Sequence, residues 1–294
     1  MKTTGLTLAF LSIISLSLAQ DYAFKVLANK GKNEVKSGDE WLPLKTGASL
    51  KLSDEIKLGP NAYLGLVYNT GKPLEVKQEG NIKISALAER MKTGGSVLTK
   101  YTDFILSSNS AEAKKNRLSA TGAVDRGDNS AIQLMLPQNQ HSGIFNNKAI
   151  ISWVGSDGPY IATIRNMFDD ELEQIETPES SFEIDLTDPK FSKENALLIE
   201  VKSKSDPRQV SKQHLIKKLA PADQENVKKS LGEIMGEVSE ATALNKFILA
   251  GFYEENNLFI DAISAYEEAI RLAPDVTSYK EAYEDFLLRH GIKK

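Results

Sequence analysis

The hydrophobic pattern of this chain changes its period near Pro207, and this change constrains the fold more than any other feature. Before Pro207, short runs of residues alternate between apolar and polar, as half-buried β-strands do. After Pro207, apolar residues recur every three or four positions, as on one face of an α-helix. We therefore predict a multidomain chain in which β structure precedes α structure.

Residues 21–107 are predicted to form a small β domain. Glycine, asparagine and lysine separate its short apolar runs, as turns between strands require. Strands at this spacing indicate a small barrel or sandwich. The alternating residues are Leu50/Leu52, Leu64/Leu66/Tyr68, Leu74/Val76 and Ile82/Ile84.

The same segment resembles the FecR-like domain family. The residues that carry the resemblance are Phe24–Leu27, Gly31, Trp41–Leu44, Gly47, Leu50, Asp54–Ile56 and Asn61–Leu64. The resemblance implies a β domain on the envelope side of a bacterial cell, which in the ferric-citrate regulator follows a transmembrane helix. Because we find neither that helix nor a cytoplasmic anti-sigma segment here, we do not expect this chain to signal across a membrane by itself.

Residues 108–129 are polar and predict a linker, with room for a helical turn at 111–118. The linker contains Arg126-Gly127-Asp128, a tripeptide that integrins bind on tight loops. Gly and Asp are also the residues that turns select, so we interpret the tripeptide as a turn.

Residues 130–206 return to strand patterns and predict an Ig-like or fibronectin-III-like β-sandwich. Proline and glycine separate the runs, and one tryptophan, Trp153, lies on an early strand. The acidic run 169–171 lacks the spacing of a calcium loop, and we interpret it as a solvated turn after Phe168. The runs are Ile150–Trp153, Tyr160–Phe168, Leu172–Thr177, Phe182–Leu186 and Ala196–Val201.

Residues 207–294 are predicted to be helical. A first apolar stripe runs from Val227 to Val238 after a helix start at Pro221, and Gly291 ends the last helix. Three further stripes follow at Leu244–Phe252, Phe259–Ile270 and Tyr279–Leu287. This segment is therefore predicted to be a C-terminal helical bundle.

Residues 243–276 resemble one tetratricopeptide repeat. Its signature positions fall on Leu249, Ala250, Tyr253, Ala262, Tyr266, Ala269 and Pro274. Lys246 stands where the family has an early tryptophan, and Ala250 stands where it has a glycine. The resemblance implies two antiparallel helices, A and B, with flanking helices that complete the core.

Residues 1–20 predict a secretory signal peptide. Lys2 precedes a short apolar run, and Ser17-Leu18-Ala19 suits cleavage near residues 19–20. The run is too short to cross a bilayer, and a chain without cysteine has no thiol for a lipid anchor. We therefore expect a periplasmic or extracellular protein with no transmembrane span and no lipid anchor.

Composition argues against most catalytic and nucleic-acid-binding classes. The chain has no cysteine and only 3 histidines, which leaves little for thiolate metal sites or a catalytic triad. Its 36 Lys/Arg and 40 Asp/Glu give a net charge of −4, without the basic excess of nucleic-acid binders. The charge is uneven, because residues 22–107 carry +4 and residues 130–205 carry −6.

These observations predict a noncatalytic, secreted protein that binds protein partners or takes part in assembly of the cell envelope. We expect no catalytic residues, cofactor or metal. One alternative is a FecR-like regulatory or sensor component acting with a membrane partner, and a second is an envelope glycan hydrolase. The candidate partner-binding residues, chosen as exposed positions of the repeat, are Asn245, Lys246, Asn256 and Asn257.

Overall fold

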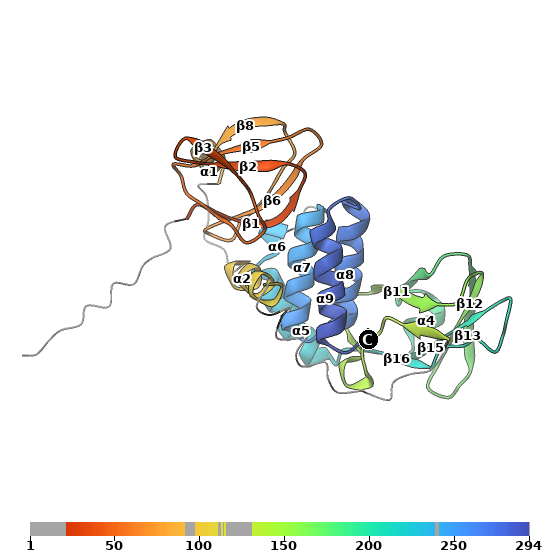
Figure 1. Ribbon diagram of the computed structural model, residues 1–294. Helices are drawn as coiled ribbons and strands as arrows, with labels where there is room; N and C mark the ends of the chain where they lie inside the picture. Colours follow the sequence, from red (N-terminus) through yellow and green to blue (C-terminus); the bar gives the residue numbers. More distant parts are fainter. Residues whose placement is uncertain are drawn as a thin grey trace, which may run out of the picture.

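The structure of the chain, a computed structural model, describes residues 22–91, 98–110, 113, 115, 131–238 and 241–293. β-sheets fill its first part and helices its last, which confirms the predicted order of β before α. Figure 1 shows the helices between two β modules. The predicted signal peptide, the Arg-Gly-Asp tripeptide and most of the predicted linker lie outside the described residues.

The first β module, residues 22–83, consists of two four-stranded antiparallel sheets. Their strand orders are β4-β1-β6-β7 and β3-β2-β5-β8. Gly31 joins the two sheets in a turn with φ +91°, where a Cβ would lie 3.2 Å from the Ala62 backbone. The strands are β1 (Phe24–Lys30), β2 (Asn33–Ser37), β3 (Glu40–Pro43), β4 (Ser49–Leu50), β5 (Glu55–Leu58), β6 (Tyr63–Tyr68), β7 (Pro73–Val76) and β8 (Gly80–Lys83).

Strand β6 is buried on both faces, whereas its sequence predicted a half-buried strand. Leu64 and Leu66 point into the core of the first β module, while Tyr63 and Val67 belong to the core of the helices. Between them, Gly65 lets a helix approach closely, because a Cβ there would lie 3.1 Å from the Leu244 side chain. The helices therefore cover the second face of this sheet.

The end of the segment predicted as β-rich is helical. It contains α1 (Ile84–Glu89) and α2 (Leu98–Ser108). α2 buries Leu98, Tyr101 and Ile105, which share one helical face, against the C-terminal helices. The ring of Tyr101 lies 5.1 Å from that of Phe252. α2 is therefore part of the helical core and not of the β module.

The second β module, residues 132–218, also contains two sheets, in the orders β10-β16-β15-β12-β13 and β14-β11-β9. Trp153 lies in the core between them, with its ring 5.1 Å from that of Tyr160. The elements are β9 (Ile132–Leu134), η1 (Asn139–His141), β10 (Gly143–Ile144), β11 (Lys148–Gly155), β12 (Tyr160–Arg165), β13 (Glu171–Thr177), β14 (Ser181–Asp185), α4 (Pro189–Ser192), β15 (Ala196–Ser203) and β16 (His214–Lys218). Because β16 belongs to this module, the structure moves the boundary predicted after residue 206 to a point after Lys218.

The C-terminal helices are α5 (Pro221–Gly232), α6 (Met235–Val238), α7 (Ala243–Glu255), α8 (Phe259–Leu272) and α9 (Thr277–Arg289). The first predicted helix is broken at 233–234, since Gly232 and Gly236 lower helix propensity there. The other three follow the predicted stripes. We call α2, α7, α8 and α9 the helical unit.

Candidate interaction site

A cleft with a volume of 880 Å³ lies where the first β module meets the helical unit. Strand β1 and the turn before β4 form one wall, α2 forms another, and α7 and α9 complete it. Its lining residues are Lys25, Leu27, Thr46, Gly47, Ser49, Asp103, Ile105, Leu106, Ser107, Asn109, Ser110, Phe247, Ser278, Glu281 and Ala282. Segments far apart in the sequence thus form one cleft.

The base of the cleft is apolar because it is the edge of a packed core. Leu27, Ile105, Phe247 and Ala282 are all buried in the hydrophobic cluster that joins β1, α2, α7 and α9. Each comes from a different element, so the cleft depends on the close fit of all four. A group that entered it would meet an ordered apolar surface.

The rim of the cleft is rich in uncharged hydrogen-bonding groups, and two of them lack a partner. The Asn109 side chain donates from Nδ2 to the Ile105 carbonyl at 2.9 Å. Its Oδ1 and the Oγ of Ser278 are buried and have no hydrogen-bond partner among the described residues. Buried polar atoms are nearly always paired, so these two are the groups that a ligand could satisfy.

The charges at the cleft largely compensate each other. Lys25 Nζ on β1 lies 2.6 Å from Asp103 Oδ1 on α2. Burial tends to lower the pKa of Lys25, but the hydrogen bond and the charge of Asp103 outweigh it, and the pKa is raised. Lys25 therefore stays protonated and ties the β module to α2, which leaves Glu281 and the hydroxyl and amide groups as the remaining polar side chains of the lining.

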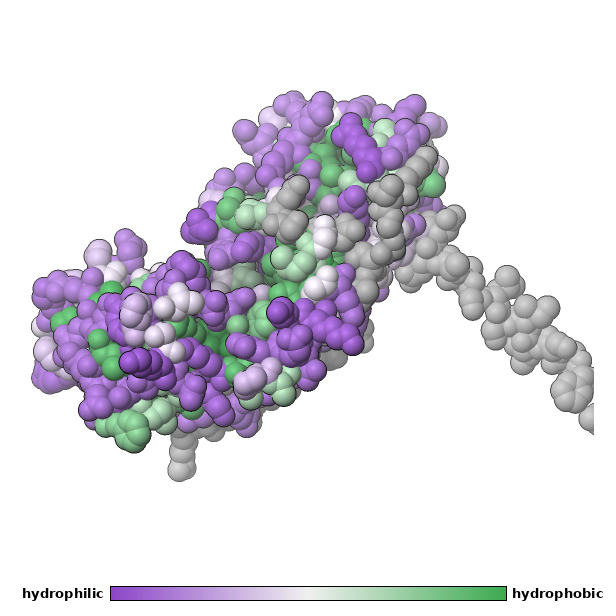
Figure 2. Space-filling view, turned by 180° about the vertical axis from the view of Figure 1, so that it is seen from behind, coloured by the Kyte–Doolittle hydropathy of each residue, from purple (hydrophilic) through white to green (hydrophobic). Residues whose placement is uncertain are grey.

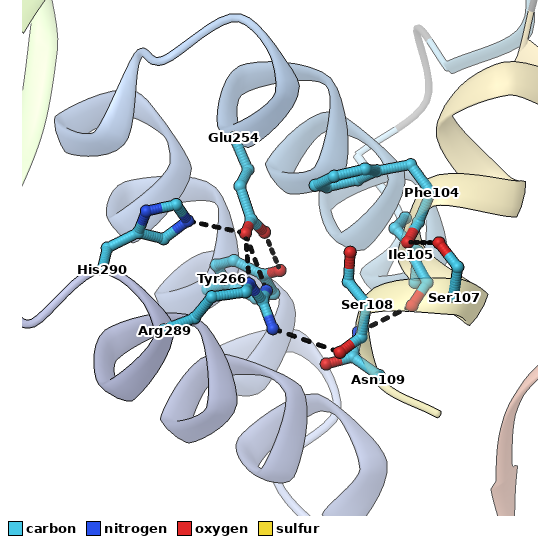
Figure 3. Close-up of polar contacts among 9 residues, drawn as sticks. All are labelled: Phe104, Ile105, Ser107, Ser108, Asn109, Glu254, Tyr266, Arg289 and His290. Atoms are coloured by element: carbon cyan, nitrogen blue, oxygen red, sulfur yellow. Dashed lines mark hydrogen bonds and ion pairs between the residues drawn. The ribbon is translucent and has the colours of Figure 1, made fainter. Parts of the chain in front are cut away.

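A buried ionic network fixes the end of α2 that borders the cleft (Figure 3). Glu254 of α7 is buried and accepts hydrogen bonds from Arg289 Nε and His290 Nε2, both at 2.8 Å, and from the Tyr266 hydroxyl at 3.2 Å. Arg289 Nη1 then donates to the Ser108 carbonyl, the last of α2, at 3.3 Å. The network thereby holds the α2 wall of the cleft against α9.

The second β module is held to α8 by three side chains spaced along one face of that helix. Asp261 accepts hydrogen bonds from the backbone N–H groups of Phe145 and Asn146 at 2.9 and 2.8 Å. One turn later, Ser264 Oγ accepts from the Ile150 N–H at 2.9 Å. Farther along, Glu267 accepts from the hydroxyls of Ser152 at 2.5 Å and Tyr283 at 2.9 Å. The outer face of α8 is therefore occupied within the chain.

The residues predicted as a repeat signature lie at the helical hairpin of α7 and α8. Ala250, Tyr253, Ala262, Tyr266 and Ala269 are buried in the helical core, and Leu249 packs against it. Pro274 follows the end of α8. The small side chains lie where the two helices approach each other, and the Tyr266 ring fills the space next to Phe247 and Phe286.

The four candidate partner-binding residues do not form one exposed surface. Asn245 is buried rather than exposed, in the first turn of α7. Lys246 is half-buried and ion-paired with Glu268 of α8. Asn256 and Asn257 are exposed, but Asn256 bonds the Phe252 carbonyl at 2.7 Å and Asn257 has φ +58°. Both have local roles in the turn between α7 and α8.

The sequence analysis selected none of the cleft residues as functional. Their side chains are mostly serine, threonine and aliphatic, which single out no chemistry in the sequence. The one available signal was the apolar stripe of Leu98, Tyr101 and Ile105, which indicates a helix that must pack on something.

Within the described ranges, no histidine and carboxylate groups are clustered as a metal ion requires. No helix in that part of the chain has the length and apolar character to span a membrane. Compared with known proteins, the chain matches no family model and no curated protein.

Proposed function

We propose that this chain is a noncatalytic protein of the bacterial cell envelope that binds an extended segment of a partner polypeptide in the 880 Å³ cleft. One observation carries the proposal: an ordered apolar base lies beside two buried polar atoms without partners, Asn109 Oδ1 and Ser278 Oγ. A bound segment would bury an apolar side chain and satisfy both atoms.

The chemistry of the rim favours a polypeptide over a charged ligand. Serine, threonine and asparagine side chains can pair with backbone N–H and C=O groups, and two of the three charged residues of the lining, Lys25 and Asp103, are paired with each other. Extended segments bind in this manner, with main-chain hydrogen bonds for affinity and a pocket for one side chain.

The helical hairpin serves in this proposal as a scaffold. α2 covers α7, the second β module covers α8, and the first β module packs on the start of α7. The two four-stranded sheets, the sandwich of sheets around Trp153 and the α7–α8 hairpin support FecR-like, Ig-like and tetratricopeptide-like assignments respectively. We place the protein in the periplasm or outside the cell on the strength of residues 1–20.

The positions of the perturbed carboxyl groups support a noncatalytic role. General acids typically have carboxyl groups with raised pKa values. Here burial raises the pKa of Asp261 and of Glu267, and both groups join α8 to the second β module. Neither lines the cleft, where Asp103 is instead ion-paired with Lys25.

The proposal is tested by closing the cleft without disturbing the core. Ser107 is exposed on α2 and lines the cleft, so Ser107→Trp should fill it. Lys280→Trp places the same side chain at an exposed position of α9 outside the cleft. We expect an envelope protein that wild type and Lys280→Trp both capture to be lost with Ser107→Trp. Equal capture by all three would contradict the proposal.

Point substitutions are needed because the chain cannot be cut after residue 206. Such a deletion removes β16 from the five-stranded sheet and strips the helical cover from β6. Incubation of the purified protein with peptidoglycan is the catalytic control. Release of soluble fragments that Ser107→Trp abolishes would replace the proposed function by glycan hydrolysis.

A further inference from the structure

The turn between β12 and β13 presents two large apolar side chains to solvent. Phe168 is 86% exposed and Met167 is 54% exposed. The turn is firmly built, since Asn166 Oδ1 accepts the N–H groups of Phe168 and Asp170 at 2.9 and 3.0 Å. We call Met167 and Phe168 the apolar tip. Single exposed hydrophobic residues are ordinary, but two neighbours held on an ordered turn resemble the anchor of a protein interface.

The surroundings of the apolar tip are acidic. Asp169, Asp170 and Glu171 follow it directly, and Arg165 is engaged with Asp169 and Glu200 at 3.5 Å each. The second β module as a whole, residues 132–218, has 10 Lys/Arg against 13 Asp/Glu, a net charge of −3. An anionic membrane surface would repel this tip, whereas a basic protein surface would attract it.

The first β module contains a hollow that matches the apolar tip in size and charge. Its volume is 260 Å³, and Tyr22, Leu52 and Tyr68 supply its apolar walls. That volume suits one aromatic side chain and lies below the roughly 300–1,000 Å³ of small-molecule sites. Lys51 lies on the rim, and the first β module, residues 22–83, has 10 Lys/Arg against 7 Asp/Glu, a net charge of +3. We call this feature the aromatic hollow.

The apolar tip and the aromatic hollow lie on different modules. Figure 1 shows the helices between these modules, so the opposite net charges of residues 22–83 and 132–218 do not face each other within one chain. On the face shown in Figure 2 the surface is mostly hydrophilic, with hydrophobic residues in small separate patches. Association through small matched features therefore suits this protein better than association through a broad apolar face.

We propose that Phe168 of one copy inserts into the aromatic hollow of a second copy, between Tyr22, Leu52 and Tyr68. Asp169 and Asp170 then approach Lys51, so that charge complementarity orients the contact. Because the two surfaces differ, each chain uses its tip toward one neighbour and its hollow toward another, which gives head-to-tail assembly. The inference goes beyond the proposed function, because it names a second copy of this chain as a partner and uses surfaces separate from the cleft.

The test is the mass of the purified chain in solution, measured by sedimentation over a range of concentrations. For an interface of this small size we expect association on the order of 10–100 µM, weakened by salt. Phe168→Ser and Leu52→Ser should each raise the dissociation constant at least about tenfold. Leu42→Ser is the matched control, because Leu42 is an exposed leucine of the same module outside the hollow.

Mixing the two variants gives the decisive result. Phe168→Ser keeps the hollow and Leu52→Ser keeps the tip, so their mixture should form a dimer that grows no further. The proposal is overturned if wild type stays monomeric, if either variant associates like wild type, or if the mixture forms no dimer. Phe168-dependent binding to phosphatidylcholine–phosphatidylglycerol vesicles without self-association would overturn it in favour of a membrane. The Ser107→Trp variant should still self-associate, so this proposal and the cleft proposal can fail separately.

Discussion

The hydroxyl groups of Tyr63 and Tyr279 lie 2.7 Å apart and join strand β6 to helix α9. The Tyr63 hydroxyl donates to Glu75 Oε1 at 2.7 Å, and the same oxygen accepts from the Leu244 N–H in the first turn of α7 at 3.0 Å. Burial raises the pKa of both tyrosines, which therefore remain hydrogen-bond donors. A continuous set of buried and partly buried hydrogen bonds thus connects the first β module to two helices.

This set has a counterpart on the other side of the helical unit. Asp261, Ser264 and Glu267 join α8 to the second β module, and Ile260 of α8 belongs to that module's hydrophobic core. Domains of one chain usually meet through surfaces that resemble transient interfaces. Here the joints are buried and polar, so neither β module can leave the helices without exposing unpaired groups.

We therefore predict that the three parts unfold in one transition. Loss of the helices, followed in urea by circular dichroism at 222 nm, should coincide with the fluorescence change of Trp153 in the second β module. The variant Trp41→Phe removes the other tryptophan, which is half-buried in β3. Two midpoints separated by more than the error of the fits would show that the second β module folds independently.

Much of the helical unit could be predicted from the sequence because each of its later helices has a single dominant core. The stripes of α7, α8 and α9 face one another, so a period of 3.6 is visible in each. The apolar stripe of α2 was equally regular, but it lies between the β-strand patterns and the polar linker 108–129, and the sequence does not show that α7 is its partner.

The cleft and the joints could not be predicted because they depend on tertiary neighbours. Along β6, Leu64 and Leu66 pack in the core of the first β module, whereas Tyr63 and Val67 pack in the core of the helices. The sequence pattern is that of a half-buried strand, but both faces of β6 are buried. Asp261 looks in the sequence like an ordinary acidic residue near the start of a helix. Only the fold places the N–H groups of Phe145 and Asn146 over its carboxylate.

Replacement of Asp261 by alanine should weaken the joint between α8 and the second β module. It leaves two backbone N–H groups without their acceptor, and each such loss costs about 1–3 kcal/mol. We expect the free energy of unfolding to fall by about 2–4 kcal/mol in urea titrations. Amide exchange at Phe145 and Asn146 should accelerate at the same time.

The matched control for this variant is Asp275→Ala. Asp275 also bridges two parts of the chain, through an ion pair with Lys30 at 3.1 Å, but its side chain is 76% exposed. Exposed ion pairs contribute about 0–1 kcal/mol. If Asp275→Ala lowers the free energy of unfolding as much as Asp261→Ala does, the burial of Asp261 is not the reason for its contribution to stability.

The stability of the protein should depend on pH through the titration of Asp261. Burial raises its pKa from 3.8 to about 6, against the opposing effect of the two N–H groups. Between these two pKa values the folded state binds more protons than the unfolded state. The contribution of Asp261 to the free energy of unfolding is therefore complete below about pH 4 and is lost as the pH rises through 6. The expected change is on the order of 3 kcal/mol.

The variant Asp261→Asn isolates this effect, because an amide keeps the shape of the side chain and does not titrate. We subtract the free energy of unfolding of Asp261→Asn from that of wild type at each pH. This difference should fall between pH 4 and pH 6 and then level off. Burial raises the pKa of Glu267 too, but Glu267 is present in both proteins and cancels in the difference. A difference that rises between pH 4 and pH 6 would contradict a raised pKa of Asp261 in the folded protein.

The contact between Gly251 and Ile105 sets how closely α2 packs on α7. A Cβ at position 251 would lie 2.6 Å from Cγ1 and 2.7 Å from Cδ1 of Ile105, which is itself buried. Overpacking of this kind costs about 1–3 kcal/mol, while alanine favours a helix over glycine by up to about 1 kcal/mol. Gly251→Ala should therefore destabilise the protein by about 1–2 kcal/mol.

A double-mutant cycle separates this clash from any other effect of the substitution. Ile105→Ala removes both clashing atoms, so Gly251→Ala should cost nothing, or should stabilise slightly, in the Ile105→Ala background. The coupling energy from urea unfolding is then about 1–2 kcal/mol and favours the double variant over the sum of the singles. Strict additivity would mean that α2 and α7 do not meet at this point, and the α2 wall of the cleft would have to be placed elsewhere.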